Sequence, residues 1–221
     1  QSDFTLSPRF FDNQKNIYQG EYRHITKNSD NIIDASIKND SVFVSKNNTS
    51  QTHFFLNSSI NSHYDFFDFS KFNLQLQNVS NDNYLKTYNI RSPIINSENT
   101  LNSYVNFEGY TNDIQISVSA EVYENLNAEK NTDKYEYISP NFNVSKNFQT
   151  NLNGSLSMTS IGYNKLFDTN KNEKIFINNF NYKSLDSINN LGLINNYEFF
   201  VKNFNANSNN SDKLKNKTEH Q

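Results

Sequence analysis

Cysteine is absent from this chain of 221 residues, and glycine and proline are rare, with 5 and 3 copies. Without cysteine, these residues cannot form a disulfide, a thiolate metal site or a cysteine nucleophile. No apolar run approaches the roughly 18 residues of a membrane-spanning helix. Nucleic acid is not an expected partner, because the net charge is -3 and no basic stripe is present.

Residues that build a hydrophobic core are scarce as well. Only 34% of the chain is hydrophobic and its mean hydropathy is -0.83, whereas a soluble domain carries roughly 45–50% apolar residues. This shortage is typical of disordered chains and also of sheets that have only one apolar face. Disordered chains lack aromatic residues, but this chain has 19 Phe and 13 Tyr. The composition therefore favours a sheet.

The clearest pattern is a two-residue alternation between Asp113 and Tyr123. Successive side chains of a strand point to opposite faces, so this segment predicts a strand with one aliphatic and one polar face. The aliphatic face holds Ile114, Ile116, Val118 and Val122, which are the lipid-facing candidates if the strand belongs to a transmembrane β-barrel. The polar face holds Gln115, Ser117, Ser119 and Glu121, which are then the candidates for facing the lumen of that barrel.

Similar alternation recurs along the chain, and helical periodicity is almost absent. Leu101 to Tyr110 alternates and is followed by the polar turn Thr111-Asn112-Asp113, so the two segments predict a hairpin. The other expected strands lie near residues 4–10, 18–24, 54–60, 72–76, 138–144, 152–158, 174–185 and 193–204.

These segments predict an all-β fold, an antiparallel meander of about 10–11 strands, each near the roughly 9–11 residues that cross a bilayer at a tilt. We interpret residues 1–204 as an open fragment of a transmembrane β-barrel, and residues 205–221 as a polar loop or disordered tail. A barrel protein must be exported, but Gln1 to Phe11 lacks the basic start and apolar block of a signal peptide. We therefore expect the chain to be an internal fragment, or a piece of the mature region, of a longer protein.

Residues that could carry catalysis are scattered. The four histidines are His24, His53, His63 and His220. Their spacing is not that of a metal site, and we expect them at the membrane interface or facing the lumen. Asp65 and Asp68 lie among phenylalanines, which favours a turn at the membrane–water boundary over acid–base chemistry. No nucleophile, base and orienting group form a recognisable set, so no enzyme activity, cofactor or metal site is predicted.

Several segments resemble the LptD (OstA) family, the outer-membrane proteins that assemble lipopolysaccharide. Thr5-Leu6-Ser7-Pro8-Arg9-Phe10, followed by a turn and Gln19-Gly20-Glu21-Tyr22-Arg23, is similar to the first two barrel strands of that family. Further on, the resemblance is carried by three patches: Asn83 to Ile90, Val122 to Leu126 and Tyr135 to Pro140. The order of these four patches over about 140 residues is more specific than any single motif.

The resemblance implies a large barrel that receives lipopolysaccharide from a periplasmic bridge protein and inserts it into the outer leaflet of the Gram-negative outer membrane. It also implies an LptE-like lipoprotein that plugs the lumen. In the family, the first and last strands meet at a weakly paired lateral gate, and Pro8 occupies the matching position. Proline cannot donate to a strand ladder, so it belongs on an edge or at a weak seam. Family members often carry barrel cysteines, which this chain lacks.

Two alternatives remain open from the sequence. Another outer-membrane barrel, a porin or a receptor, would show the same alternation without the four patches. A soluble Asn-rich β adhesin would show no aromatic belt at the strand ends and would need no detergent.

Overall fold

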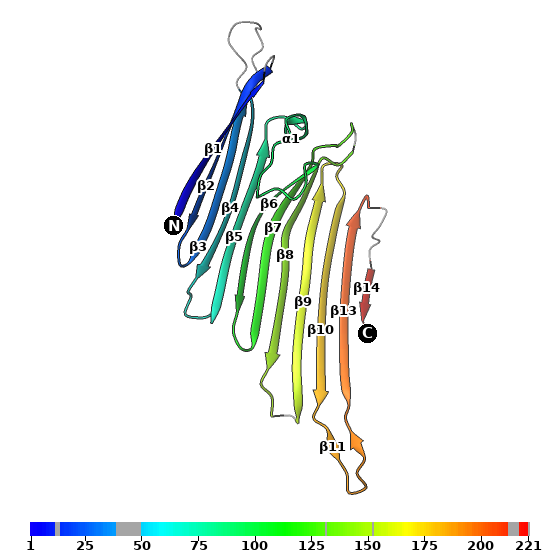
Figure 1. Cartoon of the computed structure of the whole chain (residues 1–221). Coiled ribbons are helices and arrows are strands. Elements are labelled where there is room, and N and C mark those ends of the chain that lie inside the picture. Colours follow the sequence, from blue (N-terminus) through cyan, green and yellow to red (C-terminus); the bar gives the residue numbers. More distant parts are fainter. Residues whose placement is uncertain (12–13, 39–49, 131, 152, 212–216, 221) are drawn as a thin grey trace. The chain divides into compact units, whose positions relative to one another are not determined.

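The computed structural model describes residues 1–11, 14–38, 50–130, 132–151, 153–211 and 217–220. Within these residues the chain is all-β, with one short helix, α1 (Tyr84–Thr87), in the connection between β5 and β6 (Figure 1). No helix in the described part of the chain is long and apolar enough to cross a membrane.

The strands form an antiparallel meander in chain order, as predicted. The order is β1-β2-β3-β4-β5-β6-β7-β8-β9-β10-β13-β14, in a 12-stranded sheet. Eleven of these strands have ten residues or more, and β14 has four. The end strands β1 and β14 do not pair with each other in the described residues, so the sheet is open. The bounds are β1 Ser2–Phe11, β2 Gln14–Ile25, β3 Ser29–Lys38, β4 Gln51–Ser62, β5 Phe69–Val79, β6 Thr100–Tyr110, β7 Ile114–Asn125, β8 Tyr135–Phe148, β9 Gly154–Phe167, β10 Asn172–Ser184, β13 Glu198–Asn209 and β14 Lys217–His220.

Two expectations about single segments are wrong. The polar tail expected from residue 205 starts inside β13, which pairs with β10 up to Asn209, and Lys217–His220 pairs with β13 as β14. Asparagine-rich sequence can join a ladder here because the hydrogen bonds of a ladder are made by backbone groups, which asparagine carries like any other residue. Residues 212–216 and 221 of that tail lie outside the described residues. In β8, a bulge between Ile138 and Asn141 shifts the register, so the alternation expected across 138–144 is interrupted.

Two compact units make up the chain. The first unit (residues 1–62, 71–105 and 121–135) holds the hydrophobic core. Ile17 of β2 and Phe55 of β4 are fully buried there against Tyr84, Leu85 and Ile90 of the segment that joins β5 to β6. We call residues 81–99 the cover segment, because it supplies Tyr84, Leu85, Ile90 and Ile94 to this core.

The second unit comprises residues 63–70, 106–120 and 136–221. Its turn between β4 and β5 holds Asp65 and Asp68, as predicted, and gathers aromatic rings. The ring of Phe67 lies 4.9 Å from that of Phe66 and 5.7 Å from that of Phe107, measured between centroids. Strands β10 and β13 are joined by a small exposed hairpin, β11 (Ser187–Ile188) and β12 (Ile194–Asn195).

Candidate functional site

The registers of β1 to β4 sort the side chains of the first unit into two faces. One set of neighbouring positions runs Leu6, Gly20, Ala35, Phe54 across the four strands. The set next to it runs Ser7, Gln19, Ser36, His53. Because successive side chains of a strand point to opposite faces, the first set lies on an apolar face and the second on a polar face.

The apolar face of the first unit is exposed. Phe4, Leu6 and Phe10 of β1 are 66%, 61% and 71% exposed, and Phe54 of β4 is 45% exposed. Tyr18, Tyr22, Ile37 and Leu76 of β2, β3 and β5 are exposed as well. A soluble monomer rarely leaves so extended an apolar surface in water.

The polar face of the first unit is buried. Gln19, Asp34, Ser36, His53, Gln75 and Gln77 are all buried polar side chains. The glutamines of β5 reach main-chain carbonyl groups, since Gln75 donates to Asn102 O (2.9 Å) and Gln77 to Ile94 O (3.2 Å). Thus a polar sheet face is closed from water by the cover segment, while the apolar face stays open.

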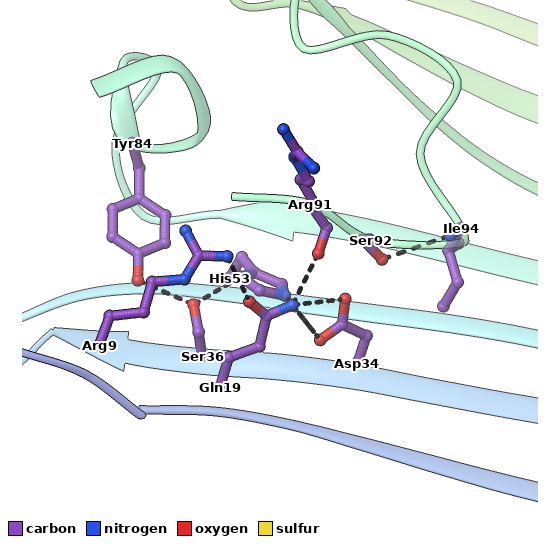
Figure 2. A network of polar contacts seen from close by, with 9 residues as sticks. All are labelled: Arg9, Gln19, Asp34, Ser36, His53, Tyr84, Arg91, Ser92 and Ile94. Carbon is purple, nitrogen blue, oxygen red and sulfur yellow. Dashed lines mark hydrogen bonds and ion pairs between the residues drawn. The ribbon is translucent and has the colours of Figure 1, made fainter. Parts of the chain in front are cut away.

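A hydrogen-bonded chain of side chains joins the buried face to the cover segment (Figure 2). Oγ of Ser36 lies 2.6 Å from Nδ1 of His53 and 2.8 Å from the Tyr84 hydroxyl. Nε2 of His53 lies 3.3 Å from Oδ1 of Asp34, and both side chains are fully buried. Nε2 of His53 faces the carboxylate without a well-aligned hydrogen bond. With its proton on Nε2, the imidazole would accept from Ser36 at Nδ1, and the Ser36 hydroxyl would accept from Tyr84.

Gln19 is a further partner of the buried carboxylate, beside His53 and the Ser92 side chain. Its Nε2 donates to both oxygens of Asp34 (3.0 and 3.1 Å) and to the main-chain oxygen of Arg91 (2.8 Å). From β1, Arg9 donates to the Tyr88 and Asn89 carbonyl oxygens, each at 2.9 Å. Main-chain carbonyl groups of three cover-segment residues therefore accept hydrogen bonds from strand side chains. Figure 2 shows the bond from Gln19 to Arg91.

Ser36, His53 and Asp34 have the connectivity of a hydrolytic triad, but their surroundings do not allow that chemistry. A nucleophilic serine needs room for a substrate carbonyl and donors for its oxyanion. Ser36 is buried, and its Oγ is already bonded to Tyr84. Burial raises the pKa of the Tyr84 hydroxyl, so Tyr84 keeps its proton for this bond. The arrangement fastens the cover segment to the sheet.

A second anchor of the cover segment lies near its start. Nζ of Lys134 lies 3.0 Å from Asp82 and 3.2 Å from Glu124 of β7. Burial alone would lower the pKa of Lys134, but the bonds to these two carboxylates outweigh it and the net shift is upward. Lys134 thus stays charged and ties Asp82 to β7.

Pro8 lies in β1, an edge strand of the sheet, as its missing donor predicts. Gln1 and Ile25 exchange both backbone hydrogen bonds, each 2.8 Å long. Since bonded and non-bonded pairs alternate in an antiparallel ladder, Asp3, Thr5 and Ser7 bond to β2, and Phe4, Leu6 and Pro8 direct their backbone groups outward. The donor that Pro8 lacks is therefore missing from the free edge, and the β1–β2 ladder is intact.

All eight face candidates from the sequence lie in β7. Gln115 and Ser117 line a hollow together with Asn143 and Ser145 of β8. Ile116, between them in the strand, also borders this hollow. The lumen-facing roles of Gln115, Ser117, Ser119 and Glu121, and the lipid-facing roles of Ile114, Ile116, Val118 and Val122, stay predictions.

Sequence reasoning missed the buried network. Strand β3, which supplies Asp34 and Ser36, was not among the expected strands, and His53 was expected only at an interface or facing the lumen. One signal could have indicated this network. Three successive segments carry polar residues where a strand would place them on one face: Gln19 in the first, Asp34 and Ser36 in the second, and His53 in the third. In the described part of the chain, no group of three or more His, Cys, Asp or Glu residues could hold a metal ion.

The chain matches no protein-family model, and no curated protein is significantly similar to it in sequence. The likeness to the LptD family therefore rests on the four sequence patches alone.

The buried Asp34–His53 pair gives a test of this site. Replacing His53→Leu leaves a buried carboxylate without its histidine, so we expect the free energy of unfolding to fall by about 3–5 kcal/mol. The double variant Asp34→Asn, His53→Leu removes the charge and keeps an acceptor for Gln19, so it should regain at least about 1 kcal/mol. Urea titration in detergent micelles, followed by circular dichroism, measures both.

His63→Leu is the matched control, because His63 is exposed in the turn after β4. Its effect should stay within about 0.5 kcal/mol. A cost for His53→Leu as small as that of His63→Leu would contradict a role for the buried pair in holding the cover segment.

Proposed function

We propose that this chain forms part of an outer-membrane β-barrel, with the apolar face of its first unit against lipid and the polar face towards the lumen. The observation that carries the proposal is the arrangement of strands β1 to β4. Their buried face mixes polar side chains such as Asp34 and His53 with Ile17 and Phe55. Large apolar side chains on the other face, such as Phe4, Leu6 and Phe54, stay exposed. Transmembrane barrels have this arrangement, with an apolar outside and a polar inside. A soluble adhesin would place its apolar residues in the core.

The lengths of the strands support the same proposal. The eleven long strands have 10 to 14 residues, and roughly 9–11 residues cross a bilayer at a tilt. In a barrel, the cover segment would lie in the lumen and close part of it, because it packs on the polar face.

Within this class we propose transport of lipopolysaccharide through a lateral gate at β1, without any bond made or broken. Phe4, Leu6 and Pro8 direct their backbone groups to the free edge, so a closing strand would find no donor at Pro8. Each lost ladder bond weakens such a seam by about 0.5–1.5 kcal/mol. An LptE-like plug lipoprotein and a periplasmic bridge protein would be the partners, with the four sequence patches as the support.

A charge placed on the apolar face tests the membrane part of the proposal. If the apolar face meets lipid, Leu56→Arg, at the middle of β4, should lower the stability of the complete protein in phospholipid vesicles by about 2–4 kcal/mol. Ser50→Arg, at the exposed residue just before β4, is the control and should cost about 0–1 kcal/mol. Equal and near-zero effects of both variants would show that this face meets water.

Photocrosslinking in the complete protein tests the transport part. A crosslinker at position 8 should capture lipopolysaccharide, whereas one at position 116 should capture only bulk membrane lipid. Lipid adducts at 116 with no lipopolysaccharide at 8 would favour a porin or a receptor. The absence of lipid adducts at both positions, in a freely soluble protein, would leave the soluble adhesin.

A further inference from the structure

The second unit carries a polar hollow of about 280 Å³ on one face of its sheet. Three strands line it in pairs of alternate residues: Glu108 and Tyr110 of β6, Gln115 and Ser117 of β7, and Asn143 and Ser145 of β8. Residues two apart in a strand share a face, so each pair presents both of its side chains to the hollow.

The two residues between these pairs form the back of the hollow. Gly109 and Ile116 also line it, but alternation turns their Cα substituents to the opposite face. A Cβ added at Gly109 would lie 2.8 Å from the Phe67 ring, which places that ring behind the strand. Only main-chain atoms of Gly109 and Ile116 therefore reach the hollow, and the short Ser117 and Ser145 side chains leave its centre open.

The polar side chains around the hollow are available to a ligand. In the described residues, Gln115, Ser117, Asn143 and Ser145 make no side-chain hydrogen bond or ion pair, and the carboxylate of Glu108 accepts one bond, from Asn106 (2.8 Å). These groups offer amide and hydroxyl donors and several acceptors. No cationic side chain lines the hollow, so an anionic group would meet Glu108 with no opposite charge to bind it.

One aromatic ring is fixed at the border of the hollow. Tyr110 is 44% exposed, and its ring stacks on that of Phe69 at 5.1 Å between centroids. The Tyr110 ring can pack against an apolar C–H face of a ligand, and the amides, hydroxyls and carboxylate beside it can hydrogen-bond to hydroxyl groups. A ligand with both features fits the hollow. The volume of about 280 Å³ is slightly below the roughly 300–1,000 Å³ of small-molecule sites, which suits one ring better than a chain.

We propose that this hollow binds a neutral sugar ring, with Glu108, Gln115 and Asn143 on its hydroxyl groups and Tyr110 against its C–H face. The site goes beyond the proposed transport function and does not depend on it, because all six side chains belong to one unit. It excludes phosphorylated sugars, since Glu108 is the only charged group in the lining.

Saturation-transfer NMR on the full chain tests the proposal, in a zwitterionic detergent without a sugar headgroup. The probes are methyl α-glucoside, methyl α-galactoside and methyl α-mannoside, with glucose 6-phosphate as the anionic comparison. At least one glycoside should receive saturation on its ring protons, and glucose 6-phosphate should receive at least about five times less, since like charges repel. No transfer to any of the three glycosides, or equal transfer to glucose 6-phosphate, would overturn the proposal.

Two variants and a control locate the binding. Ser117→Leu fills the centre of the hollow, and Glu108→Gln removes the strongest acceptor at nearly constant volume. Both should weaken glycoside binding at least about fivefold, as expected for the loss of space or of a charged hydrogen bond. Ser155→Leu, at an exposed position of β9, should leave it unchanged. Equal binding in Ser117→Leu and the unaltered chain, with unchanged circular dichroism, would place the sugar elsewhere and refute this site.

Discussion

The backbone register of β1 to β4 is the constraint on which the rest of the first unit depends. It aligns Ser7, Gln19, Ser36 and His53 on one face, and Leu6, Gly20, Ala35 and Phe54 on the other. Because side chains alternate with a period of two, a slip of one residue in any of these strands would exchange its two faces. The same register therefore determines which residues meet the surroundings and which meet the cover segment.

The buried polar side chains of β2, β3 and β4 favour this one register over others. A carboxylate buried in the sheet is costly unless it is paired and hydrogen-bonded, and Asp34 has His53 at 3.3 Å and two bonds from Gln19. Each of these side chains comes from a different strand, so the network forms only when β2, β3 and β4 are aligned. Tyr84 then joins the cover segment to the network through Ser36. Specificity for one register is the contribution we assign to this network, since a buried pair is weak evidence for net stability.

The sequence predicts the all-β meander and most strands, because period-two alternation is a local signal. It does not predict β3, since Ser29-Asp30-Asn31 is typical of a turn and the adjacent Ile32 and Ile33 break the alternation. Ile33 pairs with Leu56 on the apolar face, while Ile32 packs against the core. The network of Asp34, Ser36 and His53 could not be predicted without that strand, because its contacts depend on which strands are neighbours. The bulge in β8 and the continuation of β13 over residues 205–209 also depend on neighbouring strands, so the sequence does not predict them.

The solvent accessibility of alternate residues along β2 distinguishes an apolar face that meets lipid from one that meets water. Spin labels placed singly at positions 18, 19, 20, 21 and 22 of the complete protein in phospholipid vesicles would report collision with oxygen and with a water-soluble nickel chelate. If the apolar face meets lipid, we expect a period of two, with high oxygen and low nickel collision at 18, 20 and 22 and with the buried position 19 protected from both. High nickel collision at 18, 20 and 22 would mean that the apolar face lies in water, and the membrane proposal would be wrong.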